Sequence, residues 1–130
     1  MLYIENYDIV LITESWLNPN CCSALLDPES KYTVLRKDRD NIGGGVCALI
    51  KRNVSVVHIQ LDKKYDRLEL ICFDILYFKT KLRVFVMYRA PYSDEKAVEY
   101  LELLIDCFNT FTVNSHTNII VGDLNCSKIN

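Results

Sequence analysis

The sequence has little of what marks several protein classes. It contains only 4 glycines and 3 prolines in 130 residues, which excludes collagen-like and linker-rich chains. It has no excess of one charge, because 15 Lys and Arg stand against 17 Asp and Glu, for a formal net charge of −2. This balance excludes a histone-like basic surface, so any contact with nucleic acid must come from a local patch. Half of the residues are hydrophobic, which excludes intrinsic disorder.

Long hydrophobic runs are also absent. The longest runs, such as residues 9–12, are far too short to cross a bilayer. The first six residues lack the basic and apolar regions of a secretory signal. We therefore expect a soluble intracellular protein without a membrane partner, and no motif separates nucleus from cytoplasm. The length predicts one domain with a hydrophobic core.

The six cysteines are interpreted as reduced and structural. Four of them, Cys47, Cys72, Cys107 and Cys126, stand alone in or beside apolar segments, where a thiol behaves as a small hydrophobe. The adjacent pair Cys21-Cys22 lacks the spacing of a zinc site. Disulfides belong mainly to secreted chains, so a redox or metal role is the less favoured alternative.

Apolar runs predict seven strands and one helix. Residues 8–13 and 118–121 are typical of strands buried on both faces. Further strands are expected at 31–36, 46–52, 54–61, 68–78 and 82–88, with a hairpin turn at 79–81.

The helix is expected to begin at Ser93, Asp94 and Glu95, which suit a capped N-terminus, and to end between residues 109 and 114. Its apolar face is predicted to hold Ala97, Leu101, Leu104, Ile105 and Phe108. The element order predicts an α/β protein with a mixed sheet covered by helices.

Acidic side chains follow two of the apolar strands. Glu14 comes directly after the first strand, and Asp123 and Asn125 follow the last. Ligands of α/β proteins bind beyond the carboxyl ends of strands, so Glu14 and Asp123 are predicted to converge on a hard cation such as Mg²⁺. Asn125 is placed to donate to a phosphoryl oxygen. Two simpler interpretations stay open: Glu14 caps the next segment, and residues 122–125 are only a turn.

Other residues carry weaker signals. Tyr88 and Arg89 stand at a strand end and can address a phosphate, although a tyrosine at the edge of the core and a solvated arginine are the favoured interpretation when this motif is taken alone. Gly43-Gly44-Gly45 lacks phosphate-loop spacing and is interpreted as a flexible turn. Trp16 and Leu17 are expected to anchor their loop by packing, and His58 and His116 to be structural or exposed.

Four motifs, taken in order, resemble a known family. They are Thr13-Glu14-Ser15-Trp16-Leu17, Gly43-Gly44-Gly45-Val46, Tyr88-Arg89-Ala90-Pro91 and Val121-Gly122-Asp123-Leu124-Asn125. The same order is found in the apurinic-type endonuclease domains of LINE-type (non-LTR) retrotransposons, within the endonuclease/exonuclease/phosphatase superfamily. The resemblance implies a four-layer α/β sandwich and Mg²⁺-dependent hydrolysis of a DNA phosphodiester, with Mn²⁺ as an alternative ion and reverse transcriptase as partner.

The resemblance also assigns roles to matching residues. Glu14 corresponds to the metal-binding glutamate, and Asp123 to the aspartate that orients or deprotonates the attacking water. Asn125 corresponds to the asparagine that holds the phosphate, and Tyr88 to the tyrosine that contacts it. Arg89 is expected to bind phosphate or DNA. Metal and hydrogen-bond donors of this kind stabilise charge that develops on phosphoryl oxygens.

Departures from the family pattern predict a fragment. Ala90 replaces a proline of the usual Tyr-Arg-Pro-Pro motif, and the family's first strand, with its metal-holding asparagine, has no counterpart, since Asn6 lies in another context. The downstream Ser-Asp-His segment, which supplies the family's catalytic histidine, has none either. Residues 1–130 are therefore expected to be the N-terminal portion of the domain, inactive alone and prone to self-association through uncovered core.

Three functions are compatible with these motifs. The first is a fragment of a DNA-nicking endonuclease, and the second is a non-catalytic truncated remnant. The third is another metal-dependent phosphatase of the superfamily, against which the Glu-Ser-Trp-Leu and Tyr-Arg-x-Pro motifs argue.

Overall fold

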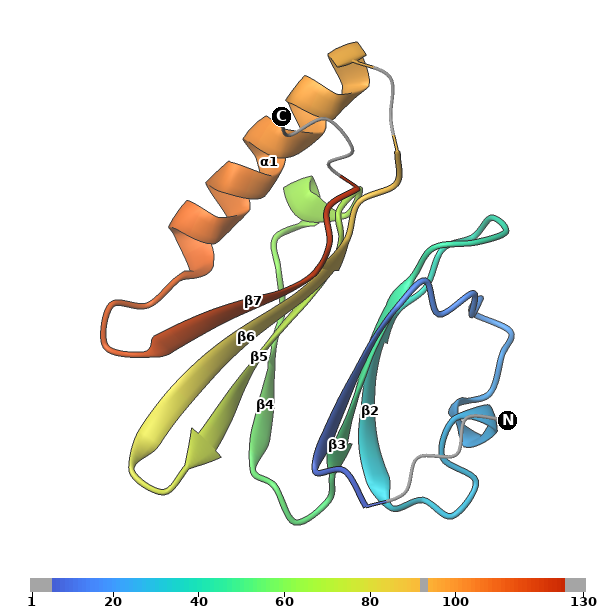
Figure 1. Cartoon of the computed structure of the whole chain (residues 1–130), viewed down its shortest axis with the longest axis vertical. Coiled ribbons are helices and arrows are strands. Elements are labelled where there is room, and N and C mark those ends of the chain that lie inside the picture. Colours follow the sequence, from blue (N-terminus) through green and yellow to red (C-terminus); the bar gives the residue numbers. More distant parts are fainter. Residues whose placement is uncertain (1–5, 92–93, 126–130) are drawn as a thin grey trace.

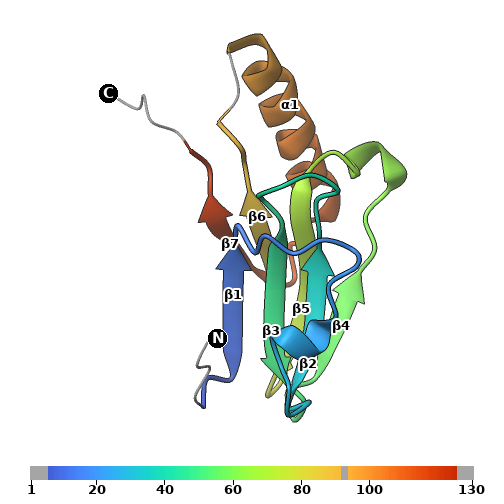
Figure 2. The ribbon, with the colours of Figure 1, turned by 90° about the vertical axis from the view of Figure 1, so that its right-hand side faces the viewer.

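The computed structural model describes residues 6–91 and 94–125, whose strands form two sheets packed face to face (Figures 1 and 2). One sheet has three antiparallel strands in the order β1-β3-β2. The other has four strands in the order β4-β5-β6-β7. The strands are β1 (Ile9–Thr13), β2 (Tyr32–Lys37), β3 (Val46–Lys51), β4 (Val56–Ile59), β5 (Glu69–Tyr77), β6 (Thr80–Tyr88) and β7 (Thr117–Asp123). Each lies within about two residues of a predicted strand.

The β5–β6 hairpin is the longest paired unit of the fold. Its register runs from Glu69 opposite Tyr88 to Tyr77 opposite Thr80. The turn therefore falls on Phe78 and Lys79, one residue before the predicted position. Phe78 has a positive φ of 54°, a conformation that tight turns demand. Cross-strand pairing over nine residues, rather than the local turn signal, fixes the register.

Strand alternation builds the central core. On β3, Val46, Ala48 and Ile50 point between the sheets, where they meet the core residues of β5 and β6. The intervening Cys47 and Leu49 point to the opposite face, where loop residues such as Leu26 cover them. This loop includes the short 3-10 helix η1 (Ser23–Leu25). Every β3 residue from Val46 to Ile50 is thus buried, which explains its unbroken apolar sequence.

Helix α1 (Asp94–Phe111) covers the outer face of the four-stranded sheet (Figure 1). Its bounds agree with the prediction, while Ser93, the predicted cap, lies outside the described residues. Tyr100, Leu104 and Cys107 are buried against the sheet beside the 3-10 helix η2 (Lys63–Tyr65). The prediction that Ile105 lies on the buried face is wrong, because its side chain is 57% exposed.

The two sheets share one open side. Strand β7 is parallel to β6, to which α1 connects it, and it forms the edge of its sheet. Strand β1 forms the edge of the other sheet on the same side (Figure 2). Ile119, Ile120 and Val121 on β7 are 38–51% exposed, and Ile9 on β1 is 37% exposed. The prediction that both strands are buried on both faces is wrong for the described structure, because no described strand pairs beyond them.

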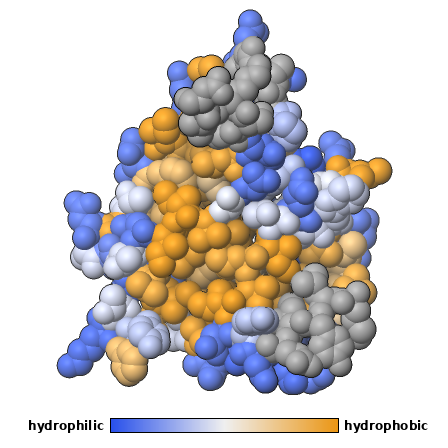
Figure 3. All heavy atoms as spheres, in the orientation of Figure 1, coloured by the Kyte–Doolittle hydropathy of each residue, from blue (hydrophilic) through white to orange (hydrophobic). Residues whose placement is uncertain are grey.

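Hydrophobic side chains gather on this open side. Figure 3 shows a broad apolar area in the middle of the molecule, over β7 and β1. Apolar surface of this kind usually marks an interaction site in a folded protein.

The described cysteines are free thiols, as predicted, and Cys126 lies outside the described residues. Cys47, Cys72 and Cys107 are buried. Burial raises the pKa of Cys47 and Cys107 to about 11 and that of Cys72 to about 12. Across residues 6–91 and 94–125, no helix has the length and hydrophobicity needed to cross a membrane.

Candidate functional site

The carboxyl ends of three strands meet at one end of the sandwich. Strands β6 and β7 are parallel, and Tyr88 at the end of β6 stands opposite Asp123 at the end of β7. Strand β1 points in the same direction (Figure 2), and the Tyr88 hydroxyl donates a hydrogen bond to Glu14 Oε1. Residues 14, 88 and 123 are thereby brought together from two sheets. Tyr88 thus contacts Glu14 and pairs with Asp123, while the convergence of the two carboxylates on a cation and the catalytic roles of these residues stay predictions.

Glu14 turns away from β1 as soon as the strand ends. Its φ is 52°, in the left-handed region that few residues other than glycine adopt, and its carboxylate is exposed. Two backbone hydrogen bonds fix the loop that follows: Ser15 N donates to Gly45 O at 3.2 Å, and Trp16 N donates to Gly44 O at 3.0 Å. The carboxylate is thus held at a defined place and still reaches solvent.

Tyr88 joins the two sheets at the site. Its side chain is only 5% exposed, and the hydrogen bond to the Glu14 carboxylate, helped by burial, raises the pKa of Tyr88 to about 12. Tyr100 of α1 donates to the carbonyl of Tyr88 at 3.1 Å. The phenol therefore stays protonated at neutral pH and orients one oxygen of Glu14.

Residues 122–125 form a tight loop beside Tyr88. Asn125 has a φ of 46°, its backbone N donates to Asp123 Oδ1 at 2.8 Å, and its side-chain Nδ2 donates to the carbonyl of Arg89 at 2.6 Å. A Cβ at Gly122 would stand 1.9 Å from the carbonyl oxygen of Met87, so only glycine allows β7 to approach β6 this closely. Asp123 is exposed, and its carboxylate is held toward the same loop.

Arg89 packs against this loop and is hydrogen-bonded to it. It is 7% exposed, and its guanidinium donates to the carbonyls of Leu124 at 2.6 Å and Asn125 at 3.2 Å. Its backbone N also extends the β6–β7 ladder to Asp123 O at 2.8 Å. The predicted contact between Arg89 and a phosphate stays a prediction. The structure adds a positioning role, because Arg89 holds the residues that carry Asp123 and Asn125.

The donor chemistry of the site fits a partly hydrated hard cation. Hydrogen bonds occupy Glu14 Oε1 and Asp123 Oδ1, which leaves Glu14 Oε2 and Asp123 Oδ2 without a hydrogen-bond partner among the described residues. Mg²⁺ in proteins binds through one or two carboxylates and keeps several waters, and carboxylate oxygens of this kind are suitable ligands for it. Within the described ranges, no group of three or more His, Cys, Asp or Glu side chains is close enough to form a complete ligand set.

Gly44 and Gly45 are closely packed, contrary to the interpretation of the segment as a flexible turn, whereas Gly43 has open space around its Cβ position. All have positive φ, and a Cβ at Gly44 would stand 2.3 Å from Glu69 Oε1 and 2.6 Å from Arg39 Cζ. Glu69 accepts from Gly45 N at 2.7 Å and is paired with Arg39. The sequence motifs did not predict this ion pair. It packs against the glycine segment to which the loop after Glu14 is hydrogen-bonded. The sequence did contain a signal for it: Glu69 is a charged residue at the start of an otherwise apolar strand, where a buried carboxylate needs a partner.

Trp16 and Leu17 have different surroundings. Leu17 is 9% exposed and anchors its loop, as predicted, whereas Trp16 is 64% exposed and does not. Of the two histidines, His58 is exposed and His116 is partly buried at the opposite end of β7 from Asp123. Neither is near the candidate site, in agreement with their sequence interpretation.

Comparison with protein-family models gives no match, and neither does comparison with curated protein sequences. Solved structures do match. D. rerio TDP2, in a complex with a single-stranded DNA product, has a TM-score of 0.62 at 14% identity over 91% of this chain and 48% of its own length. A D. rerio TDP2 humanized by 14 mutations gives a TM-score of 0.60 at 17% identity, with 91% and 52% covered. TDP2 of Caenorhabditis elegans gives 0.53 at 12% identity, with 91% and 37% covered.

These neighbours define the class of fold. The chain has an α/β sandwich of the endonuclease/exonuclease/phosphatase type, as the motif resemblance predicted. At identities of 12–17% the likeness concerns the fold alone. The chain spans about half the length of the two D. rerio structures.

Proposed function

We propose that this chain is part of a metal-dependent phosphodiesterase that nicks DNA, of the kind that LINE-type retrotransposons encode beside reverse transcriptase. The observation that carries the proposal is the hydrogen bond from Tyr88 to Glu14 next to the paired residues Tyr88 and Asp123. Four motif residues that are widely separated in sequence, 14, 88, 123 and 125, thereby surround one place. The D. rerio TDP2 complex with single-stranded DNA product supports a nucleic-acid substrate on this fold.

In this proposal the site residues divide metal binding, proton transfer, phosphate binding and positioning among them. Glu14, oriented by Tyr88, offers Oε2 to Mg²⁺ or Mn²⁺, and the ion supplies charge stabilisation for a phosphoryl oxygen. Asp123 orients and accepts a proton from the attacking water. Asn125 donates its amide to the phosphate, and Arg89 holds the 122–125 loop in place while approaching the substrate backbone. The buried contacts of Arg89 and Tyr88 mean that both act mainly by positioning.

Metal binding tests the first task without requiring turnover. Mn²⁺ binding is measured by the electron paramagnetic resonance signal of the free ion. Glu14→Gln is expected to weaken binding at least about tenfold, as the loss of an oxygen ligand should. Glu95→Gln, an exposed carboxylate on α1, serves as the matched control and should leave binding unchanged. Equal affinity of the Glu14→Gln variant and the unchanged protein contradicts the metal site.

Nicking of supercoiled plasmid tests the reaction. We expect the 130-residue chain alone to nick little or not at all with Mg²⁺, because the catalytic histidine implied by the resemblance has no counterpart in it. A reading frame extended by the flanking coding DNA is expected to contain an upstream Asn-bearing strand, a Ser-Asp-His segment and reverse transcriptase. That longer protein should nick, and Asp123→Ala should slow it at least about 100-fold. Stops or unrelated sequence on both sides favour the second candidate, a non-catalytic remnant.

The open side of the sandwich supports a proposal on assembly. Exposed apolar residues on the two edge strands favour self-association of the 130-residue chain, since unpaired strand edges pair readily with other chains. In a longer protein, further strands of the same chain would cover this side. The proposal places the protein inside the cell and leaves nucleus and cytoplasm equally open.

A further inference from the structure

The loop after Glu14 presents an unusual side chain to solvent. Trp16 is the only tryptophan of the chain, it is 64% exposed, and its φ is 57°. A left-handed conformation strains a bulky residue, and strained residues persist mainly where surrounding contacts fix them at sites of function. Here the hydrogen bond from Trp16 N to Gly44 O, at 3.0 Å, fixes the backbone. The backbone conformation at Trp16 is therefore fixed so that the indole faces solvent.

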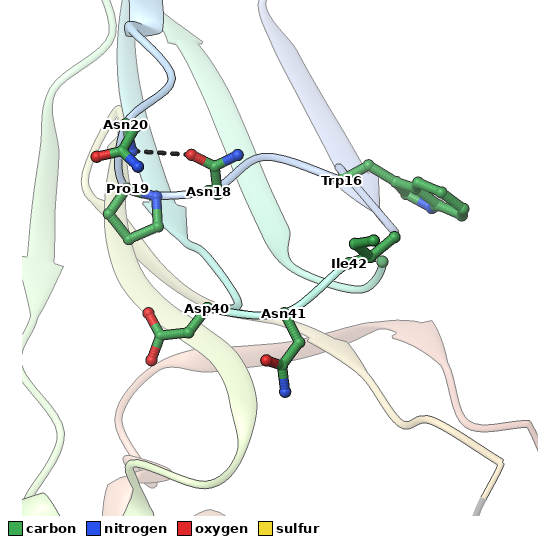
Figure 4. Close-up of a pocket in the computed structure, with 8 residues that line it drawn as sticks. Trp16, Asn18, Pro19, Asn20, Asp40, Asn41 and Ile42 are labelled. Carbon is green, nitrogen blue, oxygen red and sulfur yellow. Dashed lines mark hydrogen bonds between the residues drawn. The ribbon is translucent and has the colours of Figure 1, made fainter.

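Trp16 borders a pocket of about 380 Å³ that other loop residues complete. Figure 4 shows Trp16 next to Ile42 at one end of the pocket, with its indole directed outward, away from Asn18, Asn20, Asp40 and Asn41. Ile42 is 90% exposed. The volume lies within the range of small-ligand sites, which is about 300–1,000 Å³.

The chemistry of this pocket suits a flat, neutral, polar-edged group. None of the eight residues that line it is Lys or Arg, so it offers no cation to a phosphate. Asparagine amides and one carboxylate in the pocket supply donors and acceptors, and the exposed indole beside it supplies an aromatic surface. A nucleobase matches both features, because it has a flat face that stacks on an aromatic ring and an edge of hydrogen-bond donors and acceptors.

One side of the pocket, the loop that carries Asn18 and Asn20, is fixed by contacts with the rest of the protein. Leu17 is buried next to Trp16, and the Arg36 guanidinium donates to the carbonyls of Asn18 and Cys21, both at 2.9 Å. Arg36 is in turn paired with Asp38. The loop therefore needs little reordering when a ligand binds, which preserves affinity.

Resting on the function proposed above, we propose that the Trp16 indole stacks on one unpaired base of single-stranded DNA, beside the polar pocket and next to the phosphate bound at the candidate site. Only Ser15 separates Glu14 of that site from Trp16, so their Cα atoms lie at most about 7 Å apart. A phosphate bound at the candidate site thus places a neighbouring base within reach of the indole. The DNA that binds at this position is then single-stranded or unpaired, because a base inside a duplex cannot stack on a side chain.

The single tryptophan gives a direct test on the unaltered 130-residue chain. Trp fluorescence is titrated with a thymidine oligonucleotide of about ten residues, in the presence of a metal chelator. The matched control is an oligonucleotide of the same length with abasic residues throughout. We expect saturable quenching by the first and little quenching by the second. Equal quenching by both, or by neither, overturns the proposal.

Variants extend the test to affinity, read by fluorescence anisotropy of a labelled oligonucleotide. Trp16→Ala is expected to weaken binding about 5- to 150-fold, the range for loss of one base stack, and Trp16→Phe to restore most of it. Phe78→Ala is the control: Phe78 is 83% exposed in the β5–β6 turn, at the other end of β6 from Tyr88. A loss of affinity in Phe78→Ala as large as in Trp16→Ala contradicts a specific site.

The result separates this proposal from the proposed function. Base-dependent quenching without nicking by the extended protein supports the Trp16 site and rejects the phosphodiesterase. Nicking that depends on Asp123, together with quenching that is the same for abasic DNA, rejects the Trp16 site and keeps the phosphodiesterase. Because the fluorescence titration uses the unaltered chain, a variant that fails to fold does not remove the test.

Discussion

At the scale of single residues, Tyr88 is the centre of the candidate site. Its hydroxyl crosses from one sheet to a carboxylate of the other, and its backbone pairs with Asp123. A buried phenol that donates to a carboxylate favours the protonated form, which is why its pKa rises to about 12. The bond therefore contributes stability at every pH below the ordinary tyrosine value of about 10, and this contribution is lost as the pH rises through about 12.

Removal of this hydroxyl is expected to change the alkaline unfolding of the protein. Tyr88→Phe should lower the free energy of unfolding by about 1.5–3 kcal/mol at neutral pH, the usual range for a hydrogen bond to a charged group. The difference between the two proteins should shrink between pH 10 and pH 12. Urea unfolding at several pH values measures it, and Tyr77→Phe, an exposed tyrosine, is the control. A difference that is constant up to pH 12 contradicts the assignment.

The thiols allow a second prediction at this scale. Cys47, Cys72 and Cys107 are buried with pKa values raised to about 11–12, so thiolate is scarce at pH 8. Cys22 is exposed and Cys21 partly so. A chromogenic disulfide reagent should therefore modify Cys21 and Cys22 quickly, and the three buried thiols only as the protein unfolds, with the sites identified by peptide mass spectrometry. Fast modification of Cys72 in the folded protein goes against the described core.

At the scale of elements, the Gly43-Gly44-Gly45 segment supports the loop that carries Glu14. Gly44 and Gly45 accept from the backbone of Trp16 and Ser15, and the Glu69–Arg39 pair fills the space that a side chain at Gly44 would need. The local sequence predicts a turn here but not its rigidity, because the neighbour that closes it, Glu69, is 24 residues away from Gly45. Distant packing cannot be derived from a local pattern.

Two alanine substitutions separate packing from conformation in this segment. Gly43→Ala adds only backbone strain, because nothing lies within 4 Å of its Cβ position, and should cost about 1–2 kcal/mol. Gly44→Ala adds a clash with Glu69 and Arg39 and should cost at least about 2 kcal/mol more, as overpacking and a broken buried pair do. Thermal or urea unfolding gives both values. If the two variants are equally stable, the tight packing under the Glu14 loop is disproved.

The Arg83–Asp74 ion pair also links separate elements, at the other end of the four-stranded sheet. The two residues are cross-strand partners with nitrogen–oxygen distances of 2.7 Å, and Arg83 also donates to Phe111 O at the end of α1, at 2.7 Å. The hydrogen bonds from Arg83 lower the pKa of Asp74.

Loss of the guanidinium at residue 83 should therefore weaken both the hairpin and the docking of α1. We expect Arg83→Met to cost about 3 kcal/mol, since it leaves Asp74 partly buried without its partner. The pair's contribution is present above the ordinary aspartate pKa and is lost as the pH falls through the lowered value. Hydrogen exchange of the last turn of α1 should rise in this variant, and unchanged exchange there contradicts the link to the helix.

At the scale of the whole molecule, we expect the open side to govern association in solution. Two of the edge strands, β1 and β7, lie on it, and the neighbouring D. rerio structures are about twice as long as this chain. No strand among the described residues pairs with the outer edge of β7, where Ile119, Ile120 and Val121 are exposed, and an edge of this kind favours pairing with another strand.

A charge placed on this edge should reduce association of the 130-residue chain. Ile120 is 51% exposed, so Ile120→Lys is expected to shift the protein toward monomer, as measured by light scattering after size-exclusion chromatography. Val57→Lys, at a 59% exposed position on β4, is the matched control and should not alter the mass. A monodisperse monomer in the unaltered protein, with cooperative melting, contradicts the prediction of self-association.

The sequence by itself determined the strands, the helix and which polar residues follow the strand ends. Apolar runs reflect burial along one segment, and Gly122, Asp123 and Asn125 are local signals, so both can be predicted from consecutive residues. Only the tertiary structure decided how the strands divide between two sheets, that Tyr88 contacts Glu14, that Glu69 packs against the glycine segment and that Trp16 faces solvent. Each of these depends on contacts between residues far apart in the sequence, and no local pattern contains them.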